Sequence, residues 1–266
     1  MSLIFKLIYC FSICLTLQGG KASAQDLTLF GNDVFKQDGD SLPYRIMLPH
    51  NHQHSDKLPV IIFLHGSGER GADNQKQLLH GGSLFASDIN IINNRAVVIF
   101  PQCPLDDYWA RVERTTDSTG TISFNFQPEL EPTNAMRLLM GLIDEIWNQS
   151  WADTNRFYVG GLSMGAMGTY ELLYRRPGRF AAAIAICGGT NLSVVQSFAN
   201  DVPLWIFHGT DDPIVAVSFS EQIAETIKNL GGNPRLSLYE GVGHGSWENA
   251  FAEPELLNWL FSHKKQ

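Results

Sequence analysis

The feature that most constrains this chain is a serine flanked by two glycines, in residues 161–165 (GLSMG). An apolar, β-prone run precedes it at residues 156–160, and a run of helical character follows at 167–176. In this context the turn is so tight that a side chain two residues to either side of Ser163 would collide with neighbouring backbone. The pattern predicts a strained serine whose hydroxyl projects above a sheet, placed to act as a nucleophile.

The first 24 residues have the composition of an export signal. Lys6 gives a short positive start, residues 7–17 are apolar, and residues 22–24 (ASA) offer the small side chains that a signal peptidase reads. The apolar run is too short to be a permanent membrane span. We expect a signal peptide at 1–24 and a periplasmic or secreted domain at 25–266; an uncleaved N-terminal anchor is the alternative.

The mature chain is acidic. The formal charge of the full chain is −8, and it becomes −10 when the two lysines of the leader are removed. A net acidic surface argues against nucleic acid as a partner, and against binding to an anionic membrane after signal cleavage. The length of the mature chain suits a single α/β domain with a full core.

Two cysteines, Cys103 and Cys187, remain after cleavage. Export makes a disulfide a natural interpretation. The fold expected below separates them by two intervening strands, roughly 14 Å at about 4.8 Å per strand, which is beyond bridging range. We favour two free, buried thiols, and a disulfide stays open because loops can bend.

Apolar and β-branched runs alternate with helical patterns along the mature chain. The runs predict eight strands, at residues 27–30, 44–48, 59–64, 95–100, 156–159, 181–186, 204–207 and 235–239. The helical patterns predict four helices, at residues 134–148, 166–176, 218–230 and 253–263. This alternation indicates an α/β fold: a mostly parallel, eight-stranded sheet with helices on both faces. Ligand sites of such sheets lie at the carboxyl ends of the strands.

Polar loops follow four of these strands and bring Ser163, Asp212 and His244 to one edge. A serine hydroxyl needs a base within hydrogen-bond reach, and the base needs an orienting carboxylate. We assign Ser163 as nucleophile, His244 as general base and then acid, and Asp212 as the carboxylate. Asp212 is preferred to Asp211 because Pro213 ends the turn directly after it, and the resemblance described below supports the same choice.

The oxyanion of a tetrahedral intermediate needs hydrogen-bond donors. The Met164 N–H lies at the start of a helix, where the dipole favours negative charge. The Ser67 N–H, in the glycine-rich loop after the third strand, is expected to be the second donor.

Other histidines on the chain admit different roles. His65 and His208 each precede a glycine at a strand end and are alternative bases, although an imidazole there more often ties down backbone. His50, His52 and His54 alternate and could share a metal, but they belong to the edge opposite Ser163. We expect a solvated loop there and no metal site.

Charged and aromatic residues near the strand ends also have two interpretations. Glu69 and Arg70 could bind a charged substrate, but a local ion pair that shapes the loop is preferred. Trp109 and Trp247 are expected to wall the substrate pocket, with plain core residues as the alternative. Residues 105–131 form the longest irregular stretch and are either a cleft wall or a surface loop.

Five strings together resemble one family: residues 63–71 (FLHGSGERG) with Asn74, residues 101–104 (PQCP) with Trp109, GLSMG at 161–165, HGTDDPIV at 208–215 and GHGSW at 243–247. Nearly the whole mature chain is similar to bacterial exported carboxylesterases. These form the phospholipase/carboxylesterase-like and dienelactone-hydrolase-like branch of the α/β-hydrolase superfamily, often labelled predicted peptidases. The resemblance implies the same triad and oxyanion donors as above. Ala166 departs from it, because many relatives carry a second glycine there.

The spacing of the sixth and seventh strands bears on the substrate. Only residues 188–202 separate them, so no large cap domain is expected over Ser163. The favoured function is a serine carboxylesterase for short-chain acyl or aromatic esters, small or linked to a polysaccharide, acting through an acyl-enzyme. A serine peptidase for short peptides and an inactive binding protein are the alternatives. The chemistry requires no cofactor.

Overall fold

The computed structural model describes residues 26–49, 52–53, 56–87, 90 and 95–265, so the expected signal peptide lies outside it. The expected α/β-hydrolase fold is confirmed: one eight-stranded sheet has the order β1-β2-β4-β3-β7-β8-β9-β10. Every pair from β4 to β10 is parallel, whereas β2 is antiparallel to both of its neighbours. Its strands are β1 (Gly31–Gln37), β2 (Asp40–Met47), β3 (Leu58–Leu64), β4 (Val97–Pro101), β7 (Ala152–Leu162), β8 (Ala182–Ile186), β9 (Leu204–Gly209) and β10 (Arg235–Tyr239).

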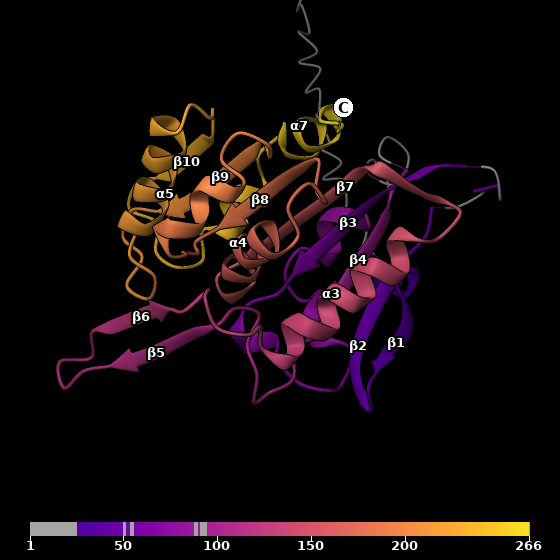
Figure 1. Ribbon diagram of the computed structural model, residues 1–266, viewed down its shortest axis with the longest axis horizontal. Helices are drawn as coiled ribbons and strands as arrows, with labels where there is room; N and C mark the ends of the chain where they lie inside the picture. The colour runs from indigo at the N-terminus through magenta and orange to yellow at the C-terminus, as the bar shows by residue number, and fades with distance from the viewer. Residues whose placement is uncertain (1–25, 50–51, 54–55, 88–89, 91–94, 266) are drawn as a thin grey trace, which may run out of the picture.

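Helices cover both faces of this sheet (Figure 1). The α-helices are α1 (Gly82–Phe85), α3 (Asn134–Trp147), α4 (Met164–Arg175), α5 (Ser218–Asn229), α6 (Trp247–Phe251) and α7 (Leu256–Ser262). Short 3-10 turns are η1 (Leu27–Leu29), η2 (Ser67–Glu69), η3 (Lys76–Leu78) and η4 (Leu192–Ser197). Helices α3, α4 and α5 pack on one face, and α1, α6 and α7 on the other. The last helix begins two residues after Pro254, later than expected.

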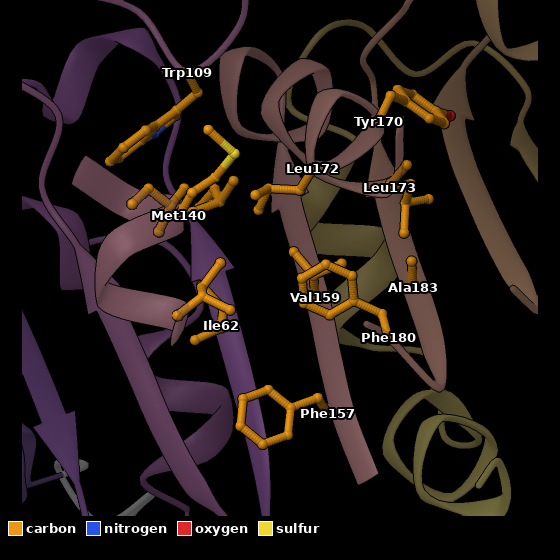
Figure 2. Packing of buried hydrophobic residues seen from close by; sticks show 14 of the residues in the cluster. Ile62, Trp109, Met140, Phe157, Val159, Tyr170, Leu172, Leu173, Phe180 and Ala183 are labelled. Carbon is orange, nitrogen blue, oxygen red and sulfur yellow. The ribbon is translucent and has the colours of Figure 1, made fainter. Parts of the chain in front are cut away.

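The buried strands explain why the sequence reads as continuous apolar runs. Every residue of β3 is buried; Val60, Ile62 and Leu64 face one core, and Ile61 and Phe63 face the other. Side chains alternate across a strand, so a strand covered on both faces must be apolar throughout. Figure 2 shows part of the core on the α3 and α4 face, including Ile62.

The first predicted strand is misplaced. Residues 27–29 form η1, because the Asp26 side chain accepts the Thr28 N–H and caps a tight turn. The first strand is instead β1, joined to β2 by a two-residue turn in which Asp38 and Gly39 both have positive φ. Asp-Gly between two strands is a strong hairpin signal, and it identifies the connection.

Residues 105–131 are less irregular than expected. They contain a separate two-stranded hairpin of β5 (Val112–Thr116) and β6 (Ile122–Phe126), which extends beyond the main sheet (Figure 1). Phe124 and Phe126 stack at 6.3 Å and both meet the ring of Phe219 on α5 edge-on. Alternation of Ile122, Phe124 and Phe126 with polar residues is the signal that identifies β6.

The interpretation of the two cysteines as buried, free thiols is confirmed. Cys103 follows β4 and Cys187 follows β8, and the strands β3 and β7 lie between them. Among the described residues, no helix combines the length and apolar character that crossing a bilayer requires.

Candidate active site

Ser163 occupies the turn between β7 and α4 in a conformation that few residues adopt. Its φ is 53° and its ψ is −117°. A Cβ on Gly165 would lie 1.9 Å from the Leu64 carbonyl oxygen, and one on Gly161 would lie 2.5 Å from the Gly165 carbonyl. The expected collisions on both sides of the serine are therefore present. The Ser163 N–H donates to the Ile186 carbonyl at 2.8 Å, which ties the turn to β8.

The structure brings together the three side chains that the sequence singled out. The Ser163 Oγ lies 2.9 Å from Nε2 of His244, and Nδ1 of His244 lies 2.7 Å from Oδ2 of Asp212. These side chains come from the ends of β7, β9 and β10, three strands whose carboxyl ends share one edge. The contacts allow a proton to pass from the hydroxyl to the imidazole while the carboxylate holds the ring.

Asp212 is held by four donors. Its Oδ1 accepts the N–H groups of Ile214 (2.8 Å) and Val215 (3.0 Å), and its Oδ2 contacts His244 and His208. Burial pushes the pKa of Asp212 upward, but these hydrogen bonds outweigh burial and hold the pKa well below its ordinary range. The carboxylate is therefore ionised, as an orienting group must be. Asp211 is exposed and accepts from the Thr210 hydroxyl instead.

His208 is a supporting residue and does not reach Ser163. Its Nε2 lies 3.2 Å from Oδ2 of Asp212 and 2.9 Å from the Val215 carbonyl, so Nε2 carries the proton. Its Nδ1 accepts from the Ser220 hydroxyl at 2.7 Å. The spacing of His208 and Asp212, four residues apart after a strand, is the signal that could have assigned this role.

His65 is bound to backbone on both sides of its ring. Nε2 accepts the Cys103 N–H at 3.0 Å, and Nδ1 donates to the Gly66 carbonyl at 2.6 Å. Burial lowers the pKa of His65 to about 4, so the ring is neutral. His65 thus joins the loop after β3 to the loop after β4 and takes no part in proton transfer.

Gln102 completes the attachment of the glycine-rich loop. Its buried amide accepts the Asn74 N–H at 2.7 Å and donates to the Glu69 carbonyl and the Asp73 carboxylate, both at 3.1 Å. The Gly71 N–H donates to the Cys103 carbonyl at 2.9 Å. The PQCP segment is therefore a support for the loop that carries Ser67.

The two expected oxyanion donors occupy equivalent positions. Ser67 is the first residue of η2, and Met164 is the first residue of α4. The N–H of a first helical residue has no carbonyl partner within its own helix, so both groups are available to an anion.

The expected role of Trp109 in the pocket wall is wrong. Its side chain has no exposed surface, and its β-carbon lies 2.5 Å from where a Cβ on Gly168 would stand. It packs edge-on against His65 at 5.4 Å and belongs to the core. Trp247 is only partly buried, and its ring meets His244 edge-on at 5.5 Å, so it does border the site.

The expected ion pair between Glu69 and Arg70 does not form. Glu69 lies instead near His80, with Oε1 3.7 Å from Nε2. Arg70 donates to the carbonyls of Ser67 and Asp107 and lies over the ring of Tyr108. No pattern in the sequence marks His80, because the contact depends on η3 and α1 folding back towards the loop.

One set of metal-type ligands occurs within the described ranges: Cys187, Asp212 and His244, whose ligand atoms lie within 4.8 Å of one another. Burial raises the pKa of the Cys187 thiol to about 12, and the Asp212 charge adds to this. A protonated thiol is a poor metal ligand, and the other two groups bond to each other. Of the alternating histidines, His52 contacts the Pro49 carbonyl, whereas His50 and His54 lie outside the described residues.

Known esterases and thioesterases have sequences similar to this chain. The family model for phospholipases and carboxylesterases matches residues 51–255. The chain is 27% identical over 210 residues to acyl-protein thioesterase 1 of Debaryomyces hansenii, covering 73% of this chain and 87% of that protein. It is 24% identical over 198 residues to the bifunctional acetylxylan esterase/xylanase XynS20E of Neocallimastix patriciarum, covering 74% of this chain and 25% of that protein.

Solved structures give the same fold. A thermostable esterase superposes with a TM-score of 0.80 at 32% identity, and the match covers 90% of this chain but only 64% of the esterase. An acylaminoacyl peptidase of Pyrococcus horikoshii superposes with a TM-score of 0.61 at 16% identity, covering 88% of this chain and 41% of the peptidase. The second likeness concerns the fold alone. Since the family model spans most of the sequence, this chain belongs to the phospholipase/carboxylesterase family of α/β-hydrolases.

Proposed function

We propose that the protein is a serine carboxylesterase that hydrolyses short-chain acyl or aromatic esters, including carbohydrate-linked ones. The observation that carries the proposal is the 2.9 Å contact between Ser163 Oγ and His244 Nε2, with His244 Nδ1 held by Asp212 at 2.7 Å. This arrangement is the one that ester cleavage through an acyl-enzyme requires.

In the first half of the reaction, Ser163 Oγ attacks the ester carbonyl and its proton passes to His244 Nε2. Asp212 stabilises the imidazolium, and the N–H groups of Ser67 and Met164 donate to the oxyanion. Collapse of the intermediate breaks the bond to the alcohol, which takes the proton from Nε2. Water then attacks the acyl-enzyme and gives a proton to His244. His244 returns this proton to Ser163 Oγ as the carboxylic acid leaves.

Bulky esters are included because no large insertion separates β8 from β9. Between β8 and β9, inside the continuously described stretch 95–265, the chain forms only the short turn η4. The esterase and acetylxylan esterase names among the relatives favour ester substrates. A serine peptidase remains the second candidate, supported by the shared machinery and by the fold of the acylaminoacyl peptidase.

A panel of p-nitrophenyl esters tests this function, with aminoacyl p-nitroanilides as the competing substrates. We expect ester hydrolysis to exceed anilide hydrolysis and to fall by about 10⁴-fold or more in Ser163→Ala. Ser193→Ala, at an exposed serine of η4, is the matched control and should keep full activity. Equal rates in Ser163→Ala and the wild type would refute the assignment, and faster anilide cleavage would favour the peptidase.

Export completes the proposal. Small residues at 22–24 follow an apolar run, so the mature protein should begin at Gln25 and act in the periplasm or outside the cell. N-terminal sequencing of protein recovered from the periplasm or medium of an expressing cell tests this. Recovery of the full chain from the membrane fraction would instead support the uncleaved anchor.

A further inference from the structure

We propose that Glu69, His80 and Trp247 bind the alcohol half of the ester and select alcohols that carry a free hydroxyl next to the ester oxygen. The substrate class would be a partly acylated, uncharged carbohydrate. This inference rests on the proposed esterase function and adds to it which half of the substrate is recognised and by which side chains.

Proton transfer places the alcohol on the His244 side of the site. The leaving oxygen takes its proton from His244 Nε2, so the alcohol must pass beside that ring. Trp247 meets His244 at 5.5 Å, and His80 lies against Trp247 at 5.0 Å with the rings inclined by 48°. Both rings are partly buried, which leaves part of their surface open. Together they form an aromatic surface next to the general acid.

Glu69 connects this surface to the nucleophile turn. Its Oε1 lies 3.7 Å from Nε2 of His80, and its Oε2 lies 3.1 Å from the place that a Cβ on Gly66 would take. The same position is 2.9 Å from Cδ1 of Leu162, the neighbour of Ser163. The carboxylate therefore lies between the nucleophile turn and the aromatic surface, two residues from the expected oxyanion donor Ser67.

The carboxylate of Glu69 is unusual in its lack of donors. Its side chain is only 10% exposed, yet within the described part of the chain no N–H or O–H group makes a hydrogen bond to either oxygen. Neither oxygen is among the fully enclosed polar atoms, so both remain reachable. A carboxylate buried to this degree ordinarily accepts several hydrogen bonds. Hydroxyl groups of a bound alcohol would supply them.

Charge and space both favour a neutral polyol. An anionic alcohol would be repelled by Glu69, and also by Glu248, which lines an adjoining hollow of about 360 Å³. His80, Ser83 and Ser87 line the same hollow and offer polar groups to further hydroxyls. The aromatic surface suits the apolar face of a sugar ring. A carbohydrate is thus the alcohol that uses all of these features.

Matched pairs of acetates test the proposal. One pair is a mono-O-acetyl methyl β-xylopyranoside against cyclohexyl acetate, and the other is monoacetylglycerol against propyl acetate. We expect the wild type to favour the pyranoside over cyclohexyl acetate by about tenfold or more in kcat/KM, as a hydrogen bond to a charged acceptor allows. Glu69→Leu should lower this ratio about tenfold, and Glu69→Gln, which keeps one accepting oxygen, should lower it less.

The ratio is measured within one enzyme sample, so partial unfolding of a variant cancels. Glu225→Gln, at an exposed glutamate of α5, is the matched control and should leave the ratio unchanged. A wild type that cleaves cyclohexyl acetate without preferring the pyranoside overturns this inference alone. A ratio that is unchanged in Glu69→Leu also overturns it, and so does a preference for monoacetylglycerol over propyl acetate without one for the pyranoside. A higher kcat/KM for acetylcholine, the ester of a cationic alcohol, than for the pyranoside overturns it as well. A wild type that cleaves no acetate, p-nitrophenyl acetate included, overturns the esterase function itself.

Discussion

The imidazole Nε2 of His208 lies 3.2 Å from the Oδ2 atom of Asp212, the same oxygen that holds His244. A single carboxylate oxygen is thus shared by two imidazoles, one facing the nucleophile and one buried behind the carboxylate. The rear imidazole is itself bonded to Ser220 and to the Val215 carbonyl, so it limits rotation of the carboxylate. His208 is a positioning residue that acts through Asp212.

Replacing His208 by Leu should therefore reduce catalysis more than substrate binding. Asp212 would keep its backbone donors on Oδ1 but lose the contact that holds Oδ2 from behind, so His244 would align less well with Ser163. We expect kcat of His208→Leu to fall by about tenfold or more with KM nearly unchanged. The fall in kcat should be smaller in His208→Gln, because glutamine keeps a hydrogen-bond donor. Steady-state kinetics normalised by titration of active sites with a fluorophosphonate measure this. A change in KM with kcat unaffected, or equal effects of the Leu and Gln substitutions on kcat, would contradict this prediction.

The stability conferred by Asp212 should depend on pH in the acid range. Its folded-state pKa lies below the ordinary 3.8 because hydrogen bonds outweigh burial. A carboxylate with a depressed pKa stabilises the fold fully above its unfolded pKa, and this contribution is lost as pH falls towards the folded pKa. The difference in Tm between wild type and Asp212→Asn should be largest near pH 7 and shrink near pH 3. Asp211→Asn, at the exposed neighbour, is the control and should differ little from the wild type in Tm at either pH. A Tm difference for Asp212→Asn that grows as the pH falls would contradict the prediction.

Gly165 should not tolerate even one added methyl group. A Cβ there would lie 1.9 Å from the Leu64 carbonyl oxygen. Leu64 belongs to β3 and Gly165 to α4, so neither backbone segment can move away easily. Gly165→Ala should therefore yield little folded protein or lose about 3 kcal/mol or more of stability. Gly68→Ala is the matched control, because a Cβ at Gly68 meets nothing within 4 Å. Chemical denaturation of both variants measures the difference, and comparable midpoints would show that the turn can relax.

The β5–β6 hairpin should loosen when Phe219 is removed. Phe219 contacts Phe124 and Phe126 and also packs on Gly189, so it links the hairpin to the strand ends, next to Met167 and Val215. Phe219→Ala should speed tryptic cleavage after the exposed Arg114 by about tenfold or more, while most of the fold stays intact. Phe261→Ala truncates a partly buried aromatic residue on the other face, beside Tyr158, and should leave this cleavage unchanged. Equal cleavage rates in all three proteins would argue that the hairpin is held elsewhere.

Local features of the sequence determined the frame of this protein. Residues 161–165 identified the serine turn because the steric demand for glycine acts over only two residues on each side. Seven of the eight main strands followed from apolar and β-branched runs, which are continuous in β3, β4, β8 and β9 because a strand buried on both faces must be apolar throughout. The contacts of Ser163, Asp212 and His244 followed because the carboxyl ends of parallel strands meet at one edge.

Tertiary structure decided which side chains reach the cleft. Trp109 is buried in the core because Gly168, some sixty residues later in the sequence, has no side chain and leaves room for it. Glu69 lies near His80 instead of Arg70, and β5 and β6 pair beyond the main sheet, where Phe126 packs on Phe219. These outcomes depend on packing between segments distant in the chain, and local sequence patterns do not predict such packing. The sequence therefore identified Ser163, Asp212 and His244, whereas the tertiary structure decided which other side chains lie around them.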